Sequence, residues 1–158
     1  MRILVLSDTH GNMIDTFLSK IKNDGVFDML IHCGDCYKDV AYILKTLNIS
    51  KCIQVNGNCD PGVEANDTEE LIIENKKFIV THGHLFGVKR DLEELKRYAE
   101  NHDADVVLFG HTHKSLSKYE NGILYFNPGT ACMPTFGKYS YGKLTIENNV
   151  IYDEIVEW

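Results

Sequence analysis

The stretch ILVLSDTH, residues 3–10, joins a short apolar run to a polar tail that contains Asp8 and His10. A run of this length that is rich in β-branched residues and ends in polar ones is typical of a buried strand. Apolar residues then recur at helical spacing from Ile14 to Ile21, and a second strand-like run occupies residues 29–32. The sequence therefore opens with a β-α-β unit, which predicts parallel strands joined by a right-handed crossover.

The chain first repeats this pattern, with a helical spacing over 40–47 and a strand-like run at 52–55. It then changes to pairs of predicted strands: 70–74 with 77–81, 116–119 with 123–126, and 139–146 with 150–156. The turn residues between the paired strands are Asn75-Lys76, Asn121-Gly122 and Asn148-Asn149. A third helix, with Val88, Leu92, Leu95 and Ala99 on one face, and a buried strand at 105–109 are predicted between the first two pairs. This order predicts an α/β protein with two sheets packed face to face and helices outside.

Length and charge exclude several classes of protein. A chain of 158 residues with 44% hydrophobic residues can bury one core, so we expect a single domain over residues 1–158. Its net charge of −7 and the lack of a basic block argue against stable binding of nucleic acid or of an anionic membrane. The opening residues lack the apolar core of a signal peptide, which predicts a cytoplasmic protein. An odd count of 5 cysteines favours reduced thiols.

Polar residues that can bind metal ions follow the predicted strands. They are Asp8 and His10, Asp35, Asn58 to Asp60, His82 and His84, and His111 and His113. Because ligands bind beyond the carboxyl ends of parallel strands, we expect these loops to converge on one edge. Carboxylates, imidazoles and an amide oxygen suit Mn²⁺, Fe, Zn²⁺ or Ni²⁺.

Two of these motifs place ligand candidates two residues apart, as Asp8 and His10 and as His111 and His113. In an extended chain both side chains of such a motif project to the same side, whereas in a turn they can be directed toward two neighbouring ions. Glycines at 34, 57, 83 and 110 each adjoin a ligand candidate, and they allow the backbone to approach the cluster or to adopt a positive φ.

In this order, the motifs D-x-H, G-D, G-N-C-D, H-G-H and G-H-T-H resemble those of the calcineurin-like metallophosphoesterases. The resemblance extends from Asp8 to the segment at 127–130, and the compact size is similar to the small prokaryotic-type phosphodiesterase branch. It implies a four-layer α/β/β/α sandwich of two mixed sheets flanked by helices. It also implies a dinuclear metal centre that hydrolyses phosphodiester bonds by attack of a metal-bridging hydroxide, without a phosphoenzyme.

The resemblance also implies a role for each matched residue. Asp8, His10 and His113 would bind the first ion, Asn58, His82 and His111 would bind the second, and Asp35 would bridge both. The expected ions are two divalent metals per chain, with Mn first and Ni, Fe, Zn or Co as alternatives. The residues expected to take part in catalysis are Asp35, Asn58, Cys59, Asp60 and His84. The expected partner is a small-molecule phosphate ester, and the sequence leaves open whether the chain forms a homo-oligomer.

Two positions depart from the family pattern. Cys59 stands where many members carry a histidine that protonates the leaving group, although the small phosphodiesterase branch often has cysteine there. The segment 133–135 reads Met-Pro-Thr, so a Pro-Arg pair that often contacts substrate in this branch is missing. Candidates for the wall of the substrate pocket are Asp60, His84, Phe86, Thr130 and Phe136.

Two other functions are compatible with parts of the sequence. A retromer coat subunit shares the expected fold and binds partner proteins without catalysis, but several of its metal ligands are replaced, whereas all of the ligand positions match here. The string Cys33-Gly34-Asp35-Cys36 also matches a C-x-x-C redox pair after a strand. A redox protein would not need the other clusters, and His32 and His102 are interpreted as structural.

Overall fold

Two five-stranded sheets form the centre of the computed structural model, which describes residues 1–11, 15–132 and 138–158. The first sheet has the order β10-β9-β1-β2-β3. Its strands are β1 (Arg2–Leu6), β2 (Met29–His32), β3 (Cys52–Gln54), β9 (Ser140–Glu147) and β10 (Val150–Glu157). The second sheet has the order β4-β5-β6-β8-β7. Its strands are β4 (Thr68–Ile73), β5 (Lys76–Thr81), β6 (Val106–Leu108), β7 (Ser115–Glu120) and β8 (Ile123–Pro128).

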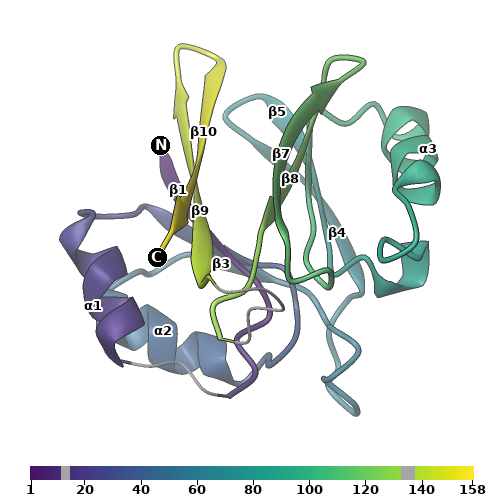
Figure 1. Ribbon diagram of the computed structural model, residues 1–158. Coiled ribbons are helices and arrows are strands. Elements are labelled where there is room, and N and C mark those ends of the chain that lie inside the picture. Colours follow the sequence, from purple (N-terminus) through teal and green to yellow (C-terminus); the bar gives the residue numbers. More distant parts are fainter. Residues whose placement is uncertain (12–14, 133–137) are drawn as a thin grey trace.

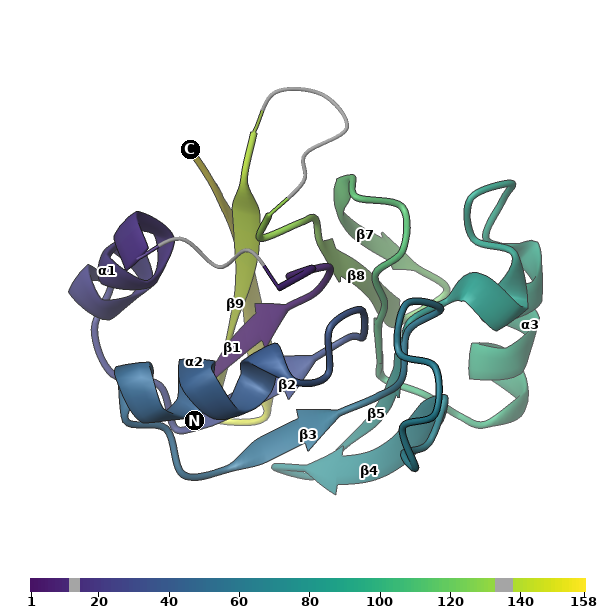
Figure 2. The same ribbon diagram turned by 90° about the horizontal axis from the view of Figure 1, so that it is seen from below.

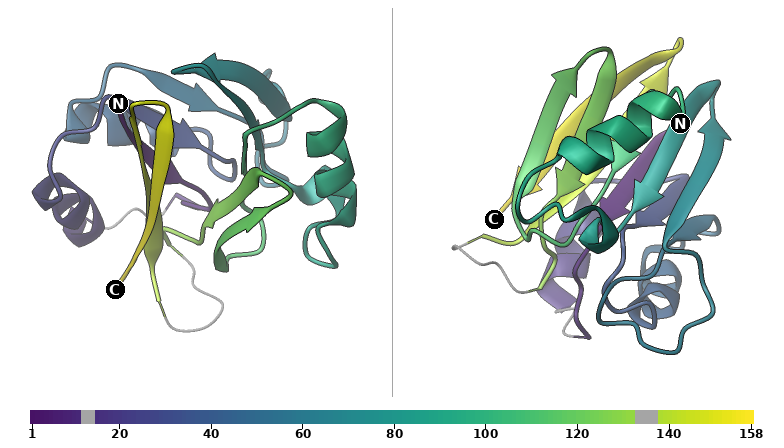
Figure 3. Two further views of the ribbon diagram at one scale, coloured as in Figure 1. Left: turned by 90° about the horizontal axis from the view of Figure 1, so that it is seen from above. Right: turned by 90° about the vertical axis from the view of Figure 1, so that its right-hand side faces the viewer.

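Helices cover the outer faces of both sheets. Helices α1 (Asp15–Asn23) and α2 (Asp39–Leu47) pack on the first sheet, and α3 (Glu93–Asn101) packs on the second (Figure 1). The right-hand view of Figure 3 looks onto α3 with the second sheet behind it. The expected α/β/β/α sandwich of two mixed sheets is confirmed.

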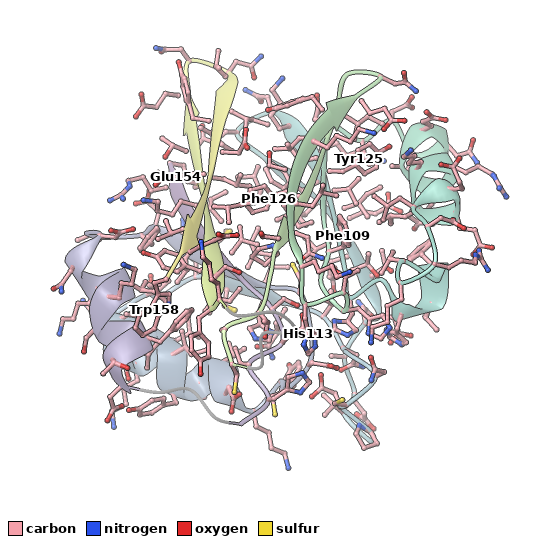
Figure 4. The ribbon with its side chains drawn as sticks, viewed as in Figure 1. Phe109, His113, Tyr125, Phe126, Glu154 and Trp158 are labelled. Atoms are coloured by element: carbon pink, nitrogen blue, oxygen red, sulfur yellow. The ribbon has the colours of Figure 1, made fainter. Side chains whose placement is uncertain are left out.

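The alternation of side chains between the two faces of each strand explains these layers. In β1, Ile3 and Val5 belong to the core between the sheets, whereas Leu4 and Leu6 pack against α1 and α2. In β8, Phe126 joins the same central core and Tyr125 faces α3, as Figure 4 shows. Successive side chains of a strand point to opposite faces, so strands buried on both faces read as continuous apolar runs. Each large side chain buried in this way contributes about 1.5–3 kcal/mol.

The predicted elements agree with the structure except at two places. The third helix begins at Glu93, not at Val88, because a 3-10 turn at His84–Phe86 is followed by Gly87 in a left-handed conformation with φ of 61°. Val88 and Leu92 nevertheless pack into the core beneath α3. In the first hairpin, positive φ angles fall on Glu74 and Asn75 instead of Asn75 and Lys76, because Ile73 pairs with Lys76.

The start of the first helix lies partly outside the described residues. Ile14 belongs to that part of the chain, and α1 is described from Asp15. In the remaining hairpins, Asn121 and Gly122 and then Asn148 and Asn149 adopt the positive φ angles that were predicted. This geometry matches the twist of the flanking strands.

Parallel strands direct the predicted site loops to one edge of the sandwich. Strand β1 pairs in parallel with β2 and β2 with β3, while β5 pairs in parallel with β6 in the other sheet. The loops that follow these strands gather at the edge that faces the viewer in Figure 2. Within the part of the chain that the structure describes, no helix is long and apolar enough to cross a membrane.

Candidate metal centre

The backbone turns sharply at several of the candidate ligands. Positive φ angles occur at Asp8 (56°), His10 (49°), Asp35 (61°), His111 (65°) and His113 (56°). Left-handed conformations are uncommon for residues other than glycine, and they concentrate at functional sites. The two motifs with residues two apart therefore lie in turns instead of extended chain.

One group of side chains combines Asp8, His10 and His113. His113 Nε2 lies 3.0 Å from Asp8 Oδ1, and His10 Nε2 lies 3.9 Å from the same oxygen. The two Nε2 atoms of His10 and His113 are 3.3 Å apart. One carboxylate oxygen and two ring nitrogens thus converge closely enough to hold one metal ion. Figure 4 places His113 at the lower end of the view, where the loops meet.

A second group combines Asn58, His82 and His111. His82 Nε2 lies 3.2 Å from Asn58 Oδ1 and 3.2 Å from His111 Nδ1. The amide nitrogen of Asn58 donates to Cys59 Sγ at 3.3 Å, which turns the amide oxygen toward His82. The set offers two imidazoles and one neutral oxygen.

Asp35 lies between the two groups. Its Oδ2 is 3.7 Å from His10 Nε2, and its Oδ1 is 3.4 Å from His82 Nε2. The backbone N–H of Cys59 donates to Oδ1 at 2.9 Å and orients the carboxylate. Each oxygen of Asp35 therefore faces a different group, which is the placement that a bridging ligand requires.

The motif at 111–113 divides between the groups. His111 faces His82, whereas His113 faces Asp8 and His10. Both side chains of the other motif, Asp8 and His10, lie in the first group. The side chains of His111 and His113 are therefore directed to different groups, as expected for a turn and not for an extended chain.

The geometry of His82 favours a proton or a metal ion at its Nε2 atom. Its Nδ1 lies 2.7 Å from the Cys33 carbonyl, which can only accept, so Nδ1 carries the proton. In a neutral ring the lone pair of Nε2 then faces Asp35 Oδ1 and Asn58 Oδ1. That contact is repulsive unless a proton or a metal ion lies between the atoms. The buried Oδ1 of Asp8 likewise has no hydrogen-bond donor of normal geometry among the described residues.

Electrostatic effects keep the carboxylates ionised. Burial raises the pKa of Asp8 and of Asp35, but neighbouring imidazoles lower both by more, so both values fall below the usual range. For His82, burial lowers the pKa, but Asp35 and Asp8 raise it by more. Burial, His82 and the charge of Lys89 lower the pKa of His111 to about 4. Anionic carboxylates and a neutral His111 are the forms that bind metal ions.

Two glycines allow the loops to approach one another. A Cβ atom at Gly57 would overlap Asp35 Oδ1 and the Asp35 backbone nitrogen. A Cβ atom at Gly110 would overlap Ser7 Oγ and come within 2.8 Å of Asp8 Oδ2. Any larger residue at either position would displace a candidate ligand.

Some residues that support the site were not singled out from the sequence. Ser7 Oγ donates to Asp8 Oδ2 at 2.5 Å, and the backbone N–H of His111 donates to the same oxygen at 3.1 Å. Asn127 Nδ2 donates to the Gly110 carbonyl at 2.9 Å. Ser7 occupies an ordinary position at a strand end, so only the contact across the site reveals its role.

The remaining candidates differ in what they contact. Both oxygens of Asp60 accept backbone N–H groups, from Cys36 and Tyr37 at Oδ1 and from Gly57 at Oδ2. Asp60 thus joins the loop of Asp35 to that of Asn58, and its part in catalysis stays a prediction.

Cys59 and His84 lie at the margin of the centre. The Cys59 side chain is exposed, and its Sγ lies within ligand distance of His10 and Asp35. Burial and the charges of Asp35 and Asp60 raise the pKa of its thiol to about 11. His84 stacks obliquely on His82, with 5.4 Å between ring centroids, and lies outside the groups that can hold an ion. Its buried Nδ1 has no hydrogen-bond partner among the described residues.

Other predicted residues take ordinary positions or lie outside the described part. His32 is buried, accepts from the backbone N–H of Gly34 and contacts Thr9 Oγ1, in keeping with a structural role. His102 stacks on Tyr98. Phe86 packs beneath α3, and Thr130 Oγ1 donates to the Asp8 carbonyl at 3.0 Å. Phe136 and the segment 133–135 lie outside the described residues. Cys33 and Cys36 are both thiols and form no disulfide with each other.

The chain is similar to known proteins over nearly its whole length. The sequence model of the calcineurin-like phosphoesterase superfamily domain matches residues 1–149. The chain is 34% identical to the probable metallophosphoesterase YsnB of Bacillus subtilis, over 94% of this chain and 86% of that one. It is 30% identical to phosphodiesterase YfcE of Escherichia coli, over 96% of this chain and 90% of that one. The solved structure of Vps29 of Entamoeba histolytica in complex with Zn²⁺ aligns with a TM-score of 0.81 and 27% identity, over 99% of each chain.

Proposed function

Because this chain belongs to the calcineurin-like phosphoesterase superfamily, in its small phosphodiesterase branch, we propose that it hydrolyses phosphodiester bonds with two divalent metal ions. The observation that carries the proposal is the position of Asp35 between two groups of nitrogen and oxygen ligands. A carboxylate that faces both groups can hold two ions close together and offset their mutual repulsion.

The residues present fit such ions. Asp8, His10 and His113 would hold the first ion, Asn58, His82 and His111 the second, and Asp35 both. A metal ion between these groups would satisfy both the buried Oδ1 of Asp8 and the Nε2 of His82. When bound, two divalent ions lower the pKa of water and withdraw charge from the phosphate. The mixture of imidazole, carboxylate and amide ligands suits divalent first-row metals, and the family resemblance puts Mn²⁺ first, with Ni, Fe, Zn or Co as alternatives.

Side chains of this chain supply the orientation. Ser7 and the backbone of His111 fix the Asp8 carboxylate, and the Cys33 carbonyl fixes the ring of His82. Asn58 contributes a neutral oxygen, so the site keeps less negative charge and an anionic phosphodiester can approach. His84 and Cys59 border the centre, where they can contact the substrate or its leaving group.

The contrasting function is a scaffold of the same fold that binds partner proteins. The likeness to Vps29 is compatible with it, because the structure of that protein in complex with Zn²⁺ aligns over nearly the whole chain. The complete set of candidate ligands in this chain favours catalysis, since a scaffold needs no carboxylate between two groups of imidazoles.

A direct assay separates the two functions. Purified protein is incubated with bis-p-nitrophenyl phosphate and, in turn, Mn²⁺, Ni²⁺, Zn²⁺ and Co²⁺, while bound metal is measured in the same samples. We expect turnover that requires metal and that is lost in Asp35→Asn. The matched control is Asp103→Asn, which changes an exposed carboxylate beyond α3. Occupied metal sites without turnover for any of these ions would exclude the enzyme and favour the scaffold.

A further inference from the structure

A pocket of about 380 Å³ lies between the segment before α3 and the start of β7. We name it the α3–β7 pocket. Its apolar surface comes from Val88, Leu92, Phe109 and Leu116, and two lysines, Lys89 and Lys114, also line it. Its volume is in the range of small-molecule sites, which combine apolar walls with a few polar groups.

The α3–β7 pocket adjoins the candidate metal centre. Thr112 lines the pocket and stands between His111 and His113 in the chain. Asn127 Nδ2 donates a hydrogen bond to the Thr112 hydroxyl at 3.1 Å. This bond fixes the Thr112 side of the pocket relative to the candidate metal centre. On another side, Val88 packs so closely on Gly83 that a Cβ there would meet Val88 Cγ2 at 2.8 Å. Gly83 follows His82 directly, so two separate walls of the pocket connect to the site.

Both lysines can offer their charge to a ligand. Among the described residues, neither the Lys89 nor the Lys114 ammonium group forms an ion pair, as is also the case for several lysines elsewhere on the surface, and no carboxylate lines the pocket. Both are exposed, and the chain as a whole carries a net charge of −7. Two unpaired cations beside one apolar surface in an acidic protein complement an anionic ligand with an apolar body.

We propose that the α3–β7 pocket binds the second ester substituent of the phosphodiester, and that this substituent is an aromatic ring that carries an anionic group. The proposal rests on the proposed function and defines the substrate class of that site. The ring lies against Val88, Leu92, Phe109 and Leu116, and its anionic group lies between Lys89 and Lys114. A diester with a small alkyl substituent leaves the pocket empty and gains nothing from it.

The test compares three diesters that share a p-nitrophenol leaving group. Their second substituents are methyl, phenyl and 4-carboxyphenyl. We expect kcat/KM to rise from methyl to phenyl to 4-carboxyphenyl beyond the difference in intrinsic reactivity. Lys89→Ala and Lys114→Ala should each lower the ratio of kcat/KM for the 4-carboxyphenyl diester to kcat/KM for the phenyl diester. The expected decrease is about two- to fivefold, which is the effect of one exposed ion pair. Lys45→Ala, an exposed lysine on α2, should leave this ratio unchanged.

A binding measurement makes the test independent of turnover. The ligand is methyl (4-carboxybenzyl)phosphonate, in which a CH₂ group replaces the ester oxygen between phosphorus and the ring. Its affinity is measured by NMR titration. Each pocket lysine variant should weaken binding by a similar factor, with shifted resonances at Leu116 and Leu92. Equal affinity in the wild-type and lysine variants, or an unchanged ratio of 4-carboxyphenyl to phenyl rates, would overturn the assignment of the pocket. Absence of hydrolysis with all three diesters would instead contradict the proposed function, while the titration would still decide the pocket.

Discussion

The Tyr141 hydroxyl donates a 2.6 Å hydrogen bond to Asp24 Oδ2, and this bond joins β9 to the residue that follows α1. Lys143 Nζ lies 2.9 Å from the same oxygen. Burial raises the pKa of Asp24, but Tyr141 and Lys143 lower it by more, so this pKa lies below the ordinary value of an aspartate. Asp24 thus stabilises the contact between the C-terminal hairpin and the first helix in its ionised form.

This contact predicts a loss of stability in acid. Because the folded pKa of Asp24 lies below the unfolded value, its contribution is fully present above about pH 4 and is lost as the pH falls through the folded pKa. Asp24→Asn should therefore lower the free energy of unfolding by about 1.5 kcal/mol at pH 7, and by progressively less below pH 4. Urea titrations of metal-free protein between pH 7 and pH 2.5 measure this difference.

The matched control for Asp24 is Asp103→Asn, which changes an exposed carboxylate beyond α3. The free energy of unfolding of this control should differ little from that of the wild type at every pH. A constant difference between wild type and Asp24→Asn over the whole pH range would show that the ionised carboxylate is not the stabilising form.

Asp35→Asn tests the bridging ligand. The substitution replaces a charged oxygen that faces one of the two groups, so the repulsion between two ions is no longer offset. We expect metal content to fall by more than one ion per chain and turnover to fall by about 10³-fold or more. His113→Ala should mainly deplete one ion. Retention of both ions in Asp35→Asn, measured by elemental analysis after dialysis, would contradict the bridging assignment.

Metal removal should lower the melting temperature. An ion bound only by the folded chain at 100 times its Kd adds about 2.7 kcal/mol of stability. For a chain of this length that corresponds to roughly 5–10 °C per ion. Calorimetry of protein stripped with EDTA and then loaded with Mn²⁺ measures the change. Identical melting curves for the two forms would mean that the cluster of seven residues is not a metal site.

Cys59 predicts a preference among leaving groups. A thiol is a weak hydrogen-bond donor, so Cys59 gives little help to a leaving group that needs a proton. Esters with good leaving groups need little protonation and should react fastest. Cys59→His should then accelerate esters with alkyl leaving groups more than aryl esters. If Cys59→Ala selectively slows the alkyl esters, the thiol itself is the acid.

Most of the fold could be predicted because its central strands, such as β1 and β8, are short and are buried on both faces. The run at 3–6 and the turn residues Asn121-Gly122 leave few alternatives for local structure. The start of the third helix could not be predicted, since Val88 and Leu92 have helical spacing but reach the same core through a turn at Gly87. A periodic pattern records which side chains are buried and says little about the backbone that buries them.

The residue types of the candidate centre could be predicted for a similar reason. Asp8, Asp35 and His82 each follow a predicted strand, and parallel strands bring such positions to one edge, so their convergence could be predicted, while the metal site stays a prediction. The contacts of Ser7 and of Asp60 with other loops could not be predicted. Such contacts join segments far apart in the chain, and no local spacing records them.

The two sheets contribute different parts of the candidate centre. Asp8, His10, Asp35 and Asn58 follow strands of the first sheet, and His82, His111 and His113 follow strands of the second. A nascent chain that has been synthesised only as far as Asn58 therefore lacks most of the imidazoles, and neither group of ligands is complete. On the proposed function, stable uptake of both ions would have to wait until residue 113 has been synthesised and the two sheets have packed together. Metal binding would then be coupled to completion of the sandwich.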